Sequence, residues 1–112
     1  MSKFVEAMDT YKSALTTLGV EFDAALLEKV TKGLGPSIYN VDSSLVSCSD
    51  QTEKDRVKNN FLIKKLGLTD SADLDAAVST VCDTLGSSNR SKHRAIFYYL
   101  LVKNLGQEGF YA

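Results

Sequence analysis

The chain has 112 residues, of which 44% are hydrophobic and 24% charged, and its formal net charge is −1. This length supports one hydrophobic core without metal or disulfide staples, and the composition excludes a disordered chain. The near-neutral charge gives no general attraction to nucleic acid or to an anionic membrane. No apolar run approaches the roughly 18 residues of a transmembrane helix, and the N-terminal residues lack a signal-peptide core. We therefore expect a cytoplasmic protein without membrane association, forming a single domain over residues 1–112.

Glycine directly follows leucine at five points, and each pair ends a stretch of helical apolar spacing. The five glycines are Gly19, Gly35, Gly67, Gly86 and Gly106. Because glycine adopts the left-handed backbone that ends many helices at no steric cost, these pairs predict five helix ends. The sequence thus predicts an all-α fold, a compact single-domain array of about five helices around a buried C-terminal helix.

The first two predicted helices span about residues 2–18 and 23–34, with apolar residues recurring on one face of each. Asp23 is a good N-cap for the second helix, and Pro36 enforces its end just after Gly35. Between residues 37 and 49 the spacing fails, which predicts an irregular but packed segment containing a short helical turn.

The third predicted helix begins at Asp50, with Glu53 three residues later as in a capping box, and runs to Leu66. The fourth ends at Leu85 and follows helical spacing throughout. Its N-terminal cap is expected from Asp70, Ser71 and Asp73.

The fifth predicted helix starts near Ser87 or Ser88 and ends at Leu105. It contains residues 95–102, AIFYYLLV, which are all apolar or aromatic. A helix with this sequence has no polar face, so other helices must surround it. The tail, residues 107–112, is expected to fold back onto the domain.

Cys48 and Cys82 are far apart in the chain and fit no zinc or Cys-x-x-Cys spacing. Each lies among apolar residues, which predicts two buried, reduced thiols.

Three segments together resemble a family of small bacterial proteins. They are residues 32–40 (KGLGPSIYN), 60–68 (NFLIKKLGL) and 97–103 (FYYLLVK), and the resemblance covers essentially the whole chain to its Tyr111-Ala112 ending. The family is classed as a domain of unknown function, number 2853. The resemblance implies a bacterial source and a compact all-helical array, and it supplies no activity and no catalytic residues.

No catalytic or cofactor motif can be assembled from the sequence. Gly33 and Gly35 lack both the third glycine of a dinucleotide loop and the Lys-Ser/Thr of a Walker loop. His93 is the only histidine, which excludes histidine-based metal clusters, and its spacing to Ile96 and Leu100 predicts a partly buried residue on an apolar helix face. We therefore expect no enzyme, no metal and no cofactor.

Charge is segmented along the chain. Residues 54–65 carry five bases and one acid, residues 66–85 four acids and no base, and residues 86–105 four bases and no acid. This pattern predicts charge complementarity between neighbouring helices, beside ordinary solvated faces.

A candidate binding site lies at the basic start of the fifth predicted helix. Its residues are Ser88, Arg90, Lys92, His93 and Arg94. A helix N-terminus offers unpaired N–H donors and a positive dipole end, and acidic capping residues are absent here, which leaves room for a phosphate or carboxylate. Lys64 and Lys65 would join the site if the third helix ends nearby. Nucleic acid is disfavoured as a ligand because the aromatic residues lie in the buried run.

Two functions follow from these patterns. The first is a non-catalytic protein-interaction or structural module with an unknown protein partner, including self-association as a homodimer. The alternative is an anion- or nucleic-acid-binding protein that uses the basic start of the last helix.

Overall fold

The computed structural model describes residues 3–20, 22–39, 45–46, 48–86 and 92–111. The described part of the chain contains five α-helices and no β-strand, which confirms the predicted all-α class. The α-helices are α1 (Lys3–Thr17), α2 (Ala24–Leu34), α3 (Gln51–Arg56), α4 (Ala72–Leu85) and α5 (Arg94–Asn104). Three short helical segments accompany them: η1 (Gly35–Tyr39), η2 (Val57–Lys65) and η3 (Glu108–Tyr111).

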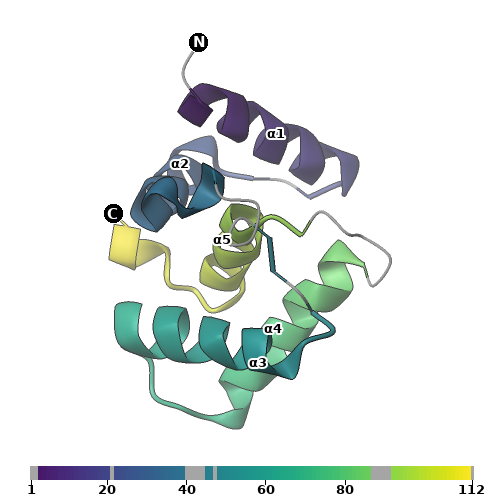
Figure 1. Ribbon diagram of the computed structural model, residues 1–112. Helices are drawn as coiled ribbons and strands as arrows, with labels where there is room; N and C mark the ends of the chain where they lie inside the picture. Colours follow the sequence, from purple (N-terminus) through teal and green to yellow (C-terminus); the bar gives the residue numbers. More distant parts are fainter. Residues whose placement is uncertain (1–2, 21, 40–44, 47, 87–91, 112) are drawn as a thin grey trace.

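Helix α5 lies at the centre of the molecule, with α1 and α2 on one side and α3 and α4 on the other (Figure 1). Every residue from Ala95 to Val102 is buried, and the side chains of Phe97 and Tyr99 are fully inaccessible. The prediction of a helix apolar on all faces and surrounded by the others is confirmed. Tyr99 also makes a polar contact, because its hydroxyl accepts a 2.8 Å hydrogen bond from the backbone N–H of Asp23.

All five predicted Leu-Gly helix ends are confirmed, since each of these glycines has a positive φ. Gly35 shows why glycine is needed: its φ of +64° and ψ of −150° lie in a region closed to residues with a side chain. Its backbone N–H donates to the carbonyl of Lys32 and so closes α2. At the other end of α2, the Asp23 carboxylate accepts from the backbone N–H groups of Ala25 and Leu26, as predicted.

The third predicted helix is continuous but not uniform. It begins as α3 and continues from Val57 to Lys65 as the π-helical η2, with i→i−5 bonds such as that from Leu66 N–H to the Phe61 carbonyl. The predicted apolar positions are buried all the same. The buried positions Val57, Phe61, Leu62 and Leu66 are spaced by four and five residues. A spacing of five residues turns about 140° away from the starting face of an α-helix, whereas the wider turn of a helix with i→i−5 bonds keeps such positions on one face.

The predicted capping box at the start of α3 forms only in part. Asp50 accepts from the backbone N–H of Thr52. Glu53, however, directs its carboxylate to Arg94 rather than back to Asp50. A guanidinium is the stronger partner for a carboxylate than a neutral amide, which explains the difference. At α4 the N-cap Ser71 makes no side-chain capping bond, and Asp73 and Asp75 supply the acidic first turn.

The tail folds back onto the domain in part. Tyr111 packs against the core, while Phe110 beside it remains 49% exposed. The buried Tyr111 hydroxyl has no hydrogen-bond partner among the described residues. Burial, with a smaller contribution from Tyr98, raises the pKa of Tyr111 to about 12. Lys65 donates a 3.1 Å hydrogen bond to the carbonyl of Gly33 and so joins η2 to α2.

Candidate functional site

The predicted basic segment is placed only in part, because Ser88 and Arg90 lie outside the described residues. Helix α5 begins at Arg94, so the predicted start near residue 87 or 88 is wrong. The physical reason is a pairing with a distant segment. Lys92 accepts a 2.8 Å backbone hydrogen bond from Val46, and His93 pairs with Leu45 in an isolated antiparallel bridge. The backbone of His93, with φ −59° and ψ 132°, is not helical, so α5 cannot begin before Arg94.

Arg94 occupies a half-buried polar cluster at the start of α5. Its guanidinium lies 2.5 Å from the Glu53 carboxylate and 3.0 Å from the Tyr98 hydroxyl, with the Leu45 carbonyl at 3.4 Å. The Arg94 and Glu53 side chains are only 15% and 14% exposed. Burial works to lower the pKa of Arg94, but Tyr98 and Glu53 outweigh it and raise the value. Glu53 therefore supplies, from α3, the negative charge that the sequence lacks at the start of α5.

Lys92 and His93 do not face solvent as a cationic pair. Lys92 is buried, with 8% of its surface exposed. His93 is half-buried, and its ring centroid lies 5.2 Å from that of Tyr11. Burial lowers the pKa of His93. The predicted partial burial of His93 is confirmed, although the residue caps α5 rather than lying within it.

The structure does not bring Lys65 to the basic start of α5. Arg94 contacts Glu53, which lies near the beginning of the continuous helix formed by α3 and η2. Lys65 lies at the other end of that helix and contacts Gly33 in α2. Lys92, His93 and Arg94 thus all contact residues 45–46, whereas Lys65 lies apart from them at Gly33. Glu53 and Tyr98, which organise this cluster, were not identified from the sequence because only the fold brings them to Arg94.

The two cysteines are joined in a disulfide, so the prediction of reduced thiols is wrong. Cys48 and Cys82 lie 34 positions apart, with their Cα atoms at 5.9 Å. Both residues are half-buried. The apolar sequence around each cysteine indicates burial, but it carries no information about which partner the fold brings near.

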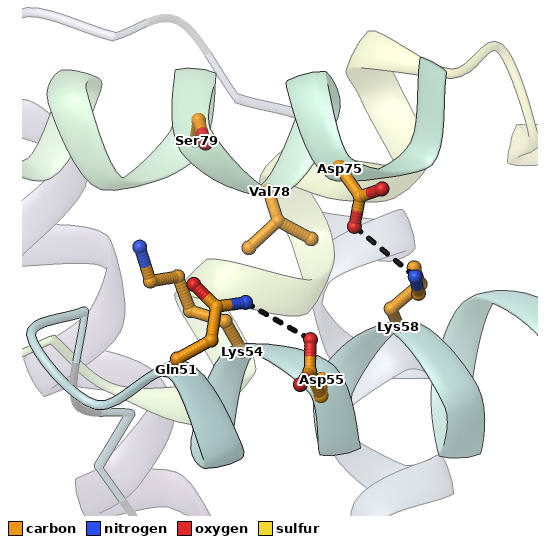
Figure 2. Close-up of a pocket in the computed structure, with 7 residues that line it drawn as sticks. All are labelled: Gln51, Lys54, Asp55, Lys58, Asp75, Val78 and Ser79. Carbon is orange, nitrogen blue, oxygen red and sulfur yellow. Dashed lines mark hydrogen bonds and ion pairs between the residues drawn. The ribbon is translucent and has the colours of Figure 1, made fainter. Parts of the chain in front are cut away.

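A polar groove of about 420 Å³ separates α3 and the beginning of η2 from α4 (Figure 2). Its charges are largely paired across the groove or along one helix. Lys58 lies 3.2 Å from Asp75 and 3.4 Å from Asp70, while Gln51 donates to Asp55. The hydrogen bond that Lys58 donates to the Asp75 carboxylate is the largest cause that raises the pKa of Lys58. The predicted complementarity between the basic third helix and the acidic fourth helix is confirmed at Lys58.

A second groove, of about 280 Å³, lies between α1 and α2 and is more apolar. It is lined by Phe4, Val5, Met8, Asp9, Lys12, Ala24, Ala25 and Glu28. Val5 is 42% exposed and is one of three exposed large hydrophobic residues among those described, with Tyr39 and Phe110. Phe4 and Met8 lie on the apolar helix face that the sequence predicts to pack against the core. Val5 lies next to that face, and the sequence analysis did not predict a binding role for it.

None of the described helices is long and apolar enough to cross a membrane. In the described part of the chain, no group of three or more His, Cys, Asp or Glu side chains could hold a metal ion. A search of curated proteins finds no match to the sequence. One protein family does match, over residues 10–109, under the description "Protein of unknown function (DUF2853)". The match covers most of the chain and agrees with the resemblance seen in its sequence. The chain belongs to this family of proteins of unknown function.

Proposed function

We propose that this protein is a non-catalytic interaction module that forms a homodimer through the groove between α1 and α2. The observation that carries the proposal is the exposed Val5 side chain beside an apolar groove floor. Exposed aliphatic surface next to a concave apolar site is typical of protein contact surfaces. A cytoplasmic location and a bacterial source belong to the same proposal.

The charges at the groove favour a second copy of this chain as the occupant. Lys32 lies over the ring of Phe4, 5.9 Å from its centroid, so the end of α2 lies beside the start of α1. The two helices therefore run in opposite directions. Glu28, one turn before Lys32, belongs to the Phe4 end of the groove, and Lys12 belongs to the other end.

A two-fold axis through the groove turns one copy end for end relative to the other. Lys12 of each copy then faces Glu28 of the second copy, and Val5 packs into the opposite apolar floor. An isologous interface needs this kind of self-complementary surface. Among the described residues, the one ion pair of Glu28 is an exposed contact of 3.9 Å to Lys32, which a better partner can replace.

The alternative function, anion binding at the start of α5, receives less support from the structure. Arg94 is engaged with Glu53 and Tyr98, and Lys92 is buried. An anion at this place would have to compete with the Glu53 carboxylate for the same guanidinium.

Sedimentation equilibrium and light scattering over a wide concentration range test the dimer. Val5→Asp is expected to weaken dimerisation at least tenfold, because it places a charge in an apolar contact. Phe110→Asp is the matched control, since Phe110 is also an exposed apolar residue (49%) but lies outside the groove. A protein that stays monomeric at every accessible concentration would overturn the proposal.

Charge reversal tests the two-fold arrangement itself. Lys12→Glu and Glu28→Lys are each expected to weaken the dimer, because each places like charges opposite one another. The double variant restores opposite charges at both symmetry-related contacts and is expected to recover dimerisation. If the double variant lost as much dimer stability as the two single variants added together, this arrangement would be contradicted.

A further inference from the structure

The Cys48–Cys82 disulfide fastens the corner of the molecule at which α5 begins. We use the name α5 corner for Leu45, Val46, Cys48 and the stretch Lys92–Arg94. Within it, the backbone bond from Val46 to Lys92 and the Leu45–His93 bridge join the two chain segments. The disulfide adds the only covalent link described between this corner and α4, through Cys82 in its last turn.

The sulfur atoms belong to residues that are half-buried rather than enclosed. Cys48 lies in a turn outside any helix, and Cys82 lies near the end of α4. Both residues pack at the margin of the core and are absent from its fully buried set. Because neither residue is fully buried, the disulfide meets one requirement for exchange, which is that a small thiol must reach a sulfur atom.

We propose that Cys48 and Cys82 form a reversible redox modification site that exchanges with low-molecular-weight thiols and disulfides. In the reducing direction, the thiolate of a small thiol attacks one cysteine sulfur and displaces the other cysteine as a thiolate. A second small thiol then attacks the mixed disulfide and releases the small-molecule disulfide and the second cysteine. Each attacking thiol gives up one proton and each cysteine gains one, so two electrons pass from the small thiols to the protein.

Reduction opens the α5 corner without dissolving the fold. The core cluster is built mainly from α1, α2, η2, α4 and α5, and Cys48 and Cys82 are partly buried residues that pack against it rather than members of it. Among the residues of the α5 corner, Val46 is the one that belongs to this buried cluster. Removing the covalent link therefore loosens the corner as a local unit, with opening confined to the elements that the disulfide tethers.

This site is independent of the proposed dimer groove, since no residue of the α5 corner lines that groove. A monomeric protein could still carry the redox site, and a dimer could lack it. The two proposals can therefore fail separately.

The test incubates the folded protein in glutathione buffers of graded thiol-to-disulfide ratio, traps free thiols by alkylation and counts them by mass spectrometry. We expect the two cysteines to react together across a defined range of ratios, while far-UV circular dichroism stays unchanged. Reduction is expected to lower the melting temperature by about 10 °C or more, as for loss of a native disulfide.

Cys48→Ser and Cys82→Ser serve as controls, because their melting temperatures should be low from the start and insensitive to reductant. If these variants fail to fold, the wild-type protein with and without reductant gives the same comparison. Three results would overturn the proposal: no disulfide in oxidising buffer, a disulfide that glutathione reduces only after the protein unfolds, or reduction that unfolds the whole chain.

Discussion

The body of α5 and the α5 corner that precedes it are held in different ways. From Ala95 to Val102 the helix is buried on all sides, and its neighbours are mainly aliphatic and aromatic. The corner is held by backbone pairing, by the Arg94–Glu53 ion pair and by one disulfide. Apolar burial is spread over many contacts, whereas the corner depends on a few specific partners.

This difference explains how each region responds to change. Loss of one methyl-sized contact in the body leaves many others, but each large side chain there carries much of the stability of a small domain. Loss of one partner in the corner leaves a polar group without its bond. The following predictions test the contrast, from the largest expected effect to the smallest.

Phe97→Ala is expected to lower the free energy of unfolding by about 3–5 kcal/mol, because it opens a cavity around a side chain with no exposed surface. Urea unfolding followed by circular dichroism measures the change. Phe110→Ala removes the same ring from a 49% exposed position and should change stability by no more than about 0.5 kcal/mol. Equal losses for the two variants would show that α5 is not the centre of the core.

Glu53→Gln is expected to cost about 1–3 kcal/mol, because it leaves the half-buried Arg94 guanidinium without its charged partner. The same unfolding measurement applies. Glu6→Gln is the control, since Glu6 is exposed and makes no ion pair with a described residue. A loss no greater than that of the control would mean that the ion pair contributes nothing to the corner.

Tyr99→Phe is expected to cost about 1 kcal/mol, because the Asp23 backbone N–H loses the hydroxyl that accepts its hydrogen bond. Tyr111→Phe is a matched control: it removes a buried hydroxyl that has no described partner, so stability should be unchanged or slightly higher. If Tyr111→Phe were the more harmful change, the two hydroxyls would have been assigned the wrong roles.

Stability should fall modestly as pH drops below about 6.5, the ordinary pKa of histidine. Burial lowers the pKa of His93 in the folded state, so the unfolded chain binds a proton at higher pH than the native protein does. The stabilisation is therefore complete above the unfolded pKa and is lost as pH falls through the folded one. His93→Gln should flatten this part of the curve of unfolding free energy against pH. An identical slope for both proteins would contradict a neutral, half-buried His93.

The parts of the fold that depend on local sequence could be predicted. Leucine-glycine pairs located all five helix ends, Asp23 capped α2 as expected, and residues 95–102 formed the buried helix. Each of these features is decided by residues within a few positions of one another. Family membership could also be inferred, because the three segments that resemble the family can be recognised in the sequence alone.

The parts that depend on distant partners could not be predicted. Helix α5 begins later than predicted, at Arg94, because the preceding residues pair with residues 45–46. The Glu53 carboxylate, predicted to cap α3, binds Arg94 instead. Cys48 forms a disulfide with Cys82, which is distant in the sequence. In each case a local preference competes with a stronger bond that only the folded chain makes available. The proposed dimer groove could not be predicted for the same reason, because it is formed by residues of both α1 and α2 and exists only once these helices have packed together.

Hydrogen exchange resolved by peptide, measured on the oxidised and the reduced protein, tests this contrast most directly. Reduction is predicted to speed exchange at residues 45–46 and 92–94 while leaving residues 95–104 as slow as before, because apolar burial holds the helix body without the disulfide. Equal acceleration in both regions, or no acceleration at the α5 corner, would contradict the account.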